Sequence, residues 1–190
     1  LDEKFSSICD FTFYDNLYLC GQINGYVTFA LFDAAAISYQ PTDIPAPAIG
    51  FCKSDDNYIV ITSLFDYISQ ASSYQIHLVS EQGTTLSNFT IPLIINDNDK
   101  IHTFVINQTI CVTDSEKCIS VDASSGAYDI LFYFDSYGDL LDFSYNNSTA
   151  LFLFKNLYGE NICYTLDGTL TLNVLSLGNS HFLNTATSVF

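Results

Sequence analysis

The sequence contains no arginine, tryptophan or methionine, and its few basic residues are five lysines and three histidines. The lysines face 21 acidic residues, which gives a formal net charge of −16. Without guanidinium groups, the chain lacks the side chain that binds phosphates bidentately, and five ammonium groups cannot neutralise a phosphate backbone. Nucleic acids, nucleotide phosphates and anionic membrane surfaces are therefore poor partners, whereas a basic protein partner suits this charge.

Charged residues of both signs are scarce, at 14% of the chain, but hydrophobic residues make up 48%. Intrinsic disorder needs low hydrophobicity together with high net charge, so this composition excludes a disordered chain. A chain of 190 residues is long enough to bury a hydrophobic core. We therefore expect a folded globular domain.

Glutamate and lysine, which favour helices, are scarce and methionine is absent, so only residues 64–72 are compatible with a short helix. Apolar and polar residues alternate with a period of two in four segments, which are residues 74–78, 89–95, 128–134 and 170–174. Aromatic and β-branched residues favour further strands at residues 26–32, 58–62, 101–106, 140–145, 150–155 and 161–166. The pattern predicts an all-β fold, an antiparallel β-sandwich or barrel-like structure of roughly a dozen short strands.

Turn residues separate these segments, and the strongest hairpin signal is at residues 134–140, where Asp, Ser and Gly lie between two apolar runs. The proline-rich stretch at about residues 41–48 could divide the chain into two domains. We favour a crossover loop within a single all-β ectodomain of residues 1–190, because the 40 residues before it provide only two or three strands.

The cysteines form an even set without any CxxC motif or Cys/His cluster, and they are Cys9, Cys20, Cys52, Cys111, Cys118 and Cys163. This spacing disfavours zinc and predicts a disulfide framework in an oxidising compartment. The pairs that we expect are Cys111–Cys118, Cys9–Cys20 and Cys52–Cys163. The first pair would pin the turn that contains Asp114 and Glu116. The alternative is that some cysteines are free buried thiols.

Four asparagines lie in N-glycosylation sequons, and they are Asn88, Asn107, Asn146 and Asn147. Together with the cysteines, they predict a secreted glycoprotein or the ectodomain of a membrane or virion surface protein. The first residues lack the pattern of a signal peptide, and the apolar run at residues 29–37 is too short to span a bilayer. We therefore expect no membrane insertion within these residues.

The candidate metal site is the Asn-Asp-Asn-Asp run at residues 96–99, which gathers oxygen ligands of the kind that Ca²⁺ prefers. Asp97 and Asp99 would be the ligands. The run lacks the glycine and glutamate spacing of an EF-hand, and Asn-Asp runs also form ordinary turns. We expect no other cofactor.

Tyrosines near turns are the candidate binding residues, because tyrosine combines an apolar ring with a hydroxyl group. They are Tyr137, Tyr145 and Tyr158. The alternative is that these rings belong to the core. Catalytic residues are not apparent, because the chain has no G-x-S-x-G motif, and the adjacent Ser180 and His181 would point to opposite faces of a strand.

These observations predict a non-catalytic recognition module outside the cell, which binds a protein or glycan on a cell surface and favours basic partners. Composition, sequons and cysteines together are similar to those of attachment glycoproteins of enveloped viruses, so a spike-type attachment domain is one alternative. A second alternative is an extracellular hydrolase, such as a glycosidase, which uses two carboxylates. A structural coat component without a ligand is a third.

Overall fold

A computed structural model describes residues 5–33, 36–45, 47–96, 100–146 and 148–175. It contains sixteen strands in four antiparallel sheets, each built from four consecutive strands. Sheet 1 contains β1 (Ser7–Tyr14), β2 (Asn16–Ile23), β3 (Tyr26–Asp33) and β4 (Ala36–Pro41). Sheet 2 contains β5 (Ala48–Lys53), β6 (Asn57–Asp66), β7 (Ala71–Ser80) and β8 (Thr85–Ile91).

Sheet 3 contains β9 (His102–Ile106), β10 (Thr109–Thr113), β11 (Lys117–Val121) and β12 (Tyr128–Tyr133). Sheet 4 contains β13 (Asp139–Asn146), β14 (Thr149–Lys155), β15 (Asn161–Leu166) and β16 (Leu172–Val174). A short 3-10 helix, η1 (Phe134–Ser136), joins sheets 3 and 4. The predictions of an all-β, antiparallel fold are therefore confirmed, but four sheets replace the two of a sandwich.

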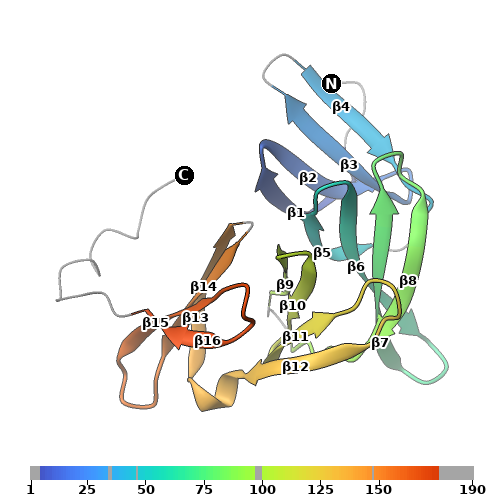
Figure 1. Ribbon diagram of the computed structural model, residues 1–190. Helices are drawn as coiled ribbons and strands as arrows, with labels where there is room; N and C mark the ends of the chain where they lie inside the picture. The colour runs from blue at the N-terminus through green and yellow to red at the C-terminus, as the bar shows by residue number, and fades with distance from the viewer. Residues whose placement is uncertain (1–4, 34–35, 46, 97–99, 147, 176–190) are drawn as a thin grey trace.

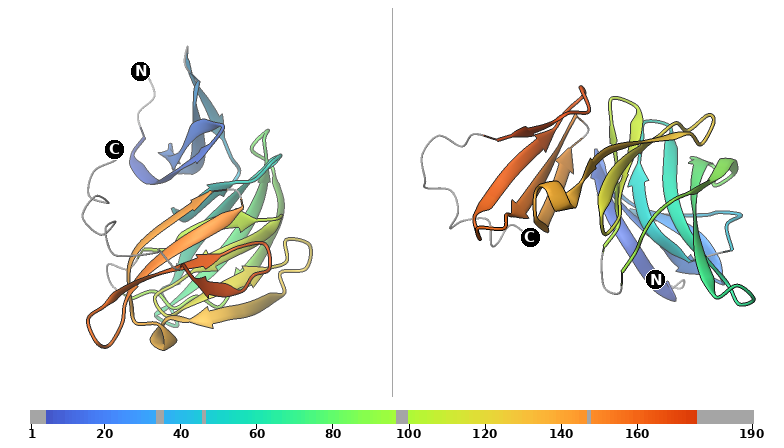
Figure 2. Two further views of the ribbon diagram at one scale, coloured as in Figure 1. Left: turned by 60° about the vertical axis from the view of Figure 1, so that its left-hand side comes forward. Right: turned by 90° about the horizontal axis from the view of Figure 1, so that it is seen from below.

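The four sheets lie around a common centre, in the manner of propeller blades (Figure 1). The first strands lie nearest this centre, and β5 contacts both β1 and β9. Figure 2 shows the same succession of sheets from the side and from below. Each sheet is complete before the chain moves on to the next, so sheets that are consecutive in the sequence are neighbours in space.

Three hydrophobic clusters hold neighbouring sheets together. The cluster between sheets 1 and 2 includes stacked rings of Phe29 and Tyr58, whose centroids lie 4.1 Å apart. Aliphatic residues such as Ile61 and Val112 fill the cluster between sheets 2 and 3, and Phe152 lies in the aromatic cluster between sheets 3 and 4. Burying one such side chain stabilises the fold by about 1.5–3 kcal/mol.

Sheets 4 and 1 are joined differently. A hydrogen bond of 2.9 Å links the hydroxyl groups of Thr12 on β1 and Tyr145 on β13. Among the described residues, no hydrophobic cluster lies between these two sheets. One face of sheet 1 and one face of sheet 4 therefore remain outside the packed clusters.

Two local predictions were wrong. Residues 64–72 form the end of β6, a turn and the start of β7, rather than a helix. Residues 134–140 contain η1 and do not form a hairpin, because β12 and β13 belong to different sheets. The proline-rich stretch connects β4 to β5, and hydrogen bonds between Val27 and both Thr42 and Ile44 hold its first part against sheet 1. That the chain is a single domain stays a prediction.

The predicted disulfide framework was also wrong, because all six cysteines are free. The β10–β11 register explains the failure for one pair: Cys111 lies opposite Ser120, and Cys118 lies opposite Thr113. Cys52 lies in the cluster between sheets 2 and 3, whereas Cys163 is a half-buried residue of sheet 4.

The Cys9–Cys20 prediction also fails, although the Cys20 thiol lies close enough to donate a hydrogen bond to Cys9, which raises the pKa of Cys20. Asp10 lies opposite Cys20, and an irregularity in β1 falls between Ile8 and Asp10. Hydrophobic packing, and not covalent cross-linking, therefore stabilises the fold. The prediction of a secreted glycoprotein depended on disulfide bonds, and the structure contradicts it on that point.

Candidate functional site

A pocket of about 610 Å³ lies between sheets 3 and 4. Four parts of the chain form its walls: the start of β9, the turn between β10 and β11, η1 and the first half of β13. A volume of this size is typical of ligand-binding pockets. Its side chains therefore define the candidate functional site.

The wall between β10 and β11 is organised by Asp114. One carboxylate oxygen, Oδ1, accepts hydrogen bonds of 2.8 Å from the backbone N–H groups of Glu116 and Lys117. The other, Oδ2, accepts from the Ile94 backbone N–H at 2.9 Å and from the Lys117 ammonium group at 2.8 Å. The predicted turn at this position is therefore confirmed, but a carboxylate stabilises it in place of a disulfide.

The opposite wall is the first half of β13, whose regular pairing with β14 is interrupted between Leu140 and Asp142. Such a β-bulge bends a strand and changes the direction of its side chains. Just before it, Gly138 has a φ of +114°, and an added Cβ would collide with the Lys155 carbonyl oxygen. Only glycine fits this close approach, which places Asp139 at the pocket.

The ring of His102 stacks on that of Phe143, with centroids 4.4 Å apart. Burial and, to a smaller extent, the charge of Lys100 lower the pKa of His102 to about 4, although the charge of Asp142 acts in the opposite direction. His102 is therefore neutral near pH 7. It contributes an aromatic surface to the pocket rather than a positive charge.

The pocket is electrostatically negative. Among the described residues, four aspartates and one lysine, Lys100, line it. The ion pair with Lys117 offsets the charge of Asp114, but Asp135, Asp139 and Asp142 are exposed. Closely spaced carboxylates on a low-dielectric wall attract cations and repel anions. The pocket therefore suits a positively charged group that also has an apolar part.

The structure does not bring the three predicted binding tyrosines together. Tyr137 packs against core rings such as Phe154 and Tyr164, with centroids 5.8 and 5.0 Å apart. Tyr145 is half-buried and bonds to Thr12, and burial raises its pKa. Tyr158 is 90% exposed in the β14–β15 turn. Their roles in binding stay predictions.

The other predicted site residues are scattered. Asp97, Asp99 and Asn147 lie outside the described residues. Asn88, Asn107 and Asn146 are exposed in sheets 2, 3 and 4, and their exposure alone does not indicate glycosylation. Within the part of the chain that the structure describes, no three metal-ligating side chains gather at one point.

The buried cysteines do not form a reactive site. Burial raises the pKa of the Cys111 thiol to about 12, and the pKa of Cys52 and that of Cys118 are raised well above the usual value. A thiol with such a pKa remains protonated at neutral pH and is a poor nucleophile or metal ligand. These cysteines are therefore structural residues of the core.

The pocket was not predicted from the sequence. Its clearest signal is the series of Asp135, Asp139 and Asp142 within one short segment, which we interpreted as a polar hairpin turn. Lys100 and His102 come from a different sheet, so their proximity depends on how the sheets pack. That packing has no signature in a single sequence.

No protein-family model and no curated protein matches this sequence. Among the solved structures that match this chain is the uncharacterized protein lmo1340 from Listeria monocytogenes EGD-e, with a TM-score of 0.44 and 8% sequence identity. The match covers 87% of this chain, which spans 63% of the length of that protein. No ligand or activity follows from this similarity.

The hydrolase alternative stays a prediction, and the attachment-domain alternative loses the cross-linked cysteines that partly supported it. Within the described residues, no helix has the length and apolarity needed to cross a bilayer.

Proposed function

We propose that this chain is a non-catalytic recognition module that binds a basic segment of a protein partner in the pocket between sheets 3 and 4. The pocket itself supports the proposal, because it combines exposed carboxylates with an aromatic surface in one concave site. The net charge of −16 adds a long-range attraction for basic partners. A location outside the cell stays a prediction.

The chemistry of lysine and arginine fits this arrangement. Their aliphatic stems pack on apolar surface while the charged group reaches a carboxylate. Here the stem would lie against Leu140 and Phe143, and the charged group would lie near Asp139 and Asp142. Charge-assisted hydrogen bonds to carboxylates would fix the orientation of the ligand.

Isothermal titration calorimetry with a short lysine-rich peptide tests the proposal. We expect binding that weakens steeply with added salt and disappears when the lysines of the peptide are acetylated. The double variant Asp139→Asn/Asp142→Asn should weaken binding about tenfold or more, because hydrogen bonds to charged groups contribute about 1.5–3 kcal/mol each. Asparagine keeps the oxygen that accepts the Phe143 N–H, so the strand should remain intact.

A charge-matched control separates pocket binding from general attraction. The variant Asp56→Asn/Asp129→Asn removes the same two charges at exposed positions of sheets 2 and 3 that do not line the pocket. This control variant should bind the lysine-rich peptide with nearly the same affinity as the unsubstituted chain. Equal losses in both double variants, or hydrolysis of the peptide, would contradict a non-catalytic pocket.

A further inference from the structure

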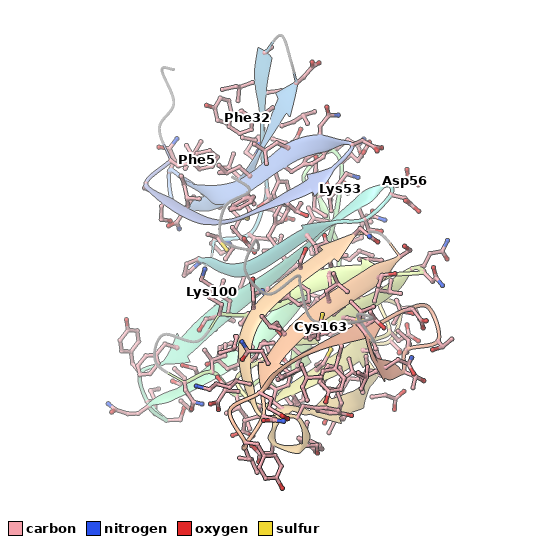
Figure 3. All side chains as sticks on the ribbon, turned by 90° about the vertical axis from the view of Figure 1, so that its left-hand side faces the viewer. Phe5, Phe32, Lys53, Asp56, Lys100 and Cys163 are labelled. Atoms are coloured by element: carbon pink, nitrogen blue, oxygen red, sulfur yellow. The ribbon has the colours of Figure 1, made fainter. Side chains whose placement is uncertain are left out.

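A second hollow lies on sheet 1, on the face that points away from sheet 2. We call this the outer face of sheet 1. Strand pairing places three cross-strand rows on it, and they are Leu17–Phe32–Ile37, Leu19–Ala30–Tyr39 and Gly21–Thr28–Pro41. Phe5 covers Gly21 on the same face, and Figure 3 shows Phe5 and Phe32 at the end of the molecule that sheet 1 forms.

None of these residues is charged, although the chain contains 21 acids. An uncharged face in so acidic a protein does not attract a basic partner, and it offers no cation to an anionic one. Any ligand that binds here must be held by apolar contacts and by neutral hydrogen bonds.

The hollow has a volume of about 430 Å³. Its lining residues include Tyr26, Tyr39 and Pro41, with Asn24 and Thr28 as polar residues. Tyr26 is 48% exposed, so its ring is accessible. The lining therefore combines flat apolar rings with amide and hydroxyl groups.

Thr28 is one of the residues that line the hollow, and its hydroxyl group forms only a weak hydrogen bond. The residue is only 2% exposed, and within the described part of the chain its hydroxyl has one hydrogen bond, which it donates to the Tyr26 carbonyl oxygen at 3.4 Å. Hydroxyl hydrogen bonds are usually 2.5–3.0 Å long, so this contact is weak. By contrast, the hydroxyl of Thr42 donates to the Val27 carbonyl oxygen at 2.8 Å and accepts from the Ile44 backbone N–H at 3.1 Å. The Thr28 hydroxyl is therefore an incompletely bonded polar group among the residues that line the hollow.

The ring of Tyr39 and the backbone at Tyr26 are held in place before any ligand binds. Phe5 contacts Tyr39, with ring centroids 5.9 Å apart. Asn24 and Gly25 both have positive φ, of 53° and 85°, which is the backbone of a tight hairpin turn and fixes the start of β3 at Tyr26. A preformed site loses less conformational entropy on binding.

We infer that this hollow binds a neutral saccharide. The two faces of a sugar ring carry C–H groups that pack on aromatic rings, and its hydroxyl groups pair with amide and hydroxyl side chains. Tyr26 and Tyr39 supply the rings, whereas Thr28 and Asn24 supply the polar partners. The inference is independent of the acidic pocket, because the two sites share no residue.

Amide-detected NMR titration of the isotope-labelled chain with a panel of neutral oligosaccharides, beginning with chitotriose and maltotriose, tests the inference. We expect shifts at residues 23–28 and 39–42 that do not depend on salt. Tyr26→Ala should weaken binding about tenfold through the lost ring, and Thr28→Val should weaken it about three- to tenfold through the lost hydroxyl. Thr28→Val removes a poorly satisfied polar group, so it should fold normally.

Tyr128→Ala is the matched control, because Tyr128 is 46% exposed but lies on sheet 3. It should leave saccharide binding unchanged, as should Asp139→Asn/Asp142→Asn. Three results would overturn the inference: no shifts with any neutral sugar of the panel, equal binding by the Tyr26 variant, or shifts at these residues only with an uncharged peptide. A negative result with the saccharides would not affect the proposal for the acidic pocket. A negative result with the lysine-rich peptide would not affect the inference for this hollow.

Discussion

Asp114 and Lys117 form a buried ion pair, with the Lys117 ammonium nitrogen 2.8 Å from the Asp114 Oδ2 atom. Asp114 also bonds to the Ile94 backbone, and the neighbouring Glu116 carbonyl accepts a hydrogen bond of 2.7 Å from the Phe134 N–H. The turn that carries the pair therefore connects directly to η1, which forms another wall of the pocket. Stability and the shape of the site depend on the same contacts.

Asp114→Ala should destabilise the protein by about 3–5 kcal/mol, because it leaves the Lys117 charge buried without its partner. Denaturant unfolding followed by circular dichroism measures this loss. Asp129→Ala, at an exposed position of β12, is the control and should change stability by less than about 0.5 kcal/mol. Equal costs for the two variants would show that the ion pair is not structurally important.

Gly138→Ala should destabilise the protein by about 1–3 kcal/mol, because Gly138 combines a positive φ with a close approach to the Lys155 backbone. Gly159 also has a positive φ, of 82°, but an added Cβ would have no neighbour within 4 Å. Gly159→Ala should therefore cost less. Thermal unfolding of both variants checks this order, and the reverse order would contradict the described β13 geometry.

The stability of the protein should fall as the pH drops from about 6.5 toward 4. His102 has a folded-state pKa of about 4 and a usual value of 6.5, so in this interval the unfolded chain binds the proton and the folded chain does not. The stabilisation is complete above pH 6.5 and decreases by up to about 3 kcal/mol toward pH 4. Burial also lowers the pKa of His77, which adds to the effect.

NMR titration of the His102 ring tests the cause directly. We expect a midpoint near 4 rather than near 6.5. The variant His102→Phe keeps an aromatic ring and should flatten the pH dependence of unfolding. A His102 midpoint near the usual value would show that the ring is not buried against Phe143.

The six cysteines should all react with an alkylating reagent in denatured protein without prior reduction. Intact mass should then increase by six adducts. In the native protein, the half-buried Cys9 and Cys163 should react before the four buried residues, because reaction needs exposure and thiolate. Any pair that reacts only after reduction would contradict the free thiols of the structure.

Much of the strand content could be predicted from the sequence, because alternation reports which residues of a strand face a core. Residues 150–155 and 161–166, for example, correspond to β14 and β15. The pattern failed in sheet 2, where His77 was expected on a polar face but is only 7% exposed. Sheet 2 has a hydrophobic cluster on each face, so residues on both faces are buried, His77 included. The buried His77 ring forms a hydrogen bond of 2.9 Å between its Nε2 atom and the Thr62 hydroxyl group.

The division into sheets could not be predicted, because turn residues do not say whether the next strand joins the same sheet. The polar segment after Phe134 carries hairpin signals but crosses from sheet 3 to sheet 4. Its aspartates therefore meet His102, which lies about thirty residues earlier in the chain. The turn at Asp114 was predicted correctly, but for the wrong chemical reason, since local sequence does not distinguish a carboxylate cap from a cysteine cross-link.

Chemical-shift mapping of the isotope-labelled chain with the lysine-rich peptide tests the central claim most directly, because it locates the ligand. Binding in the acidic pocket predicts that the largest amide shifts occur at His102 and at residues 135–143, and that they vanish with the acetylated peptide. Absence of shifts, or shifts spread evenly over the acidic surface, would contradict a dedicated site between sheets 3 and 4.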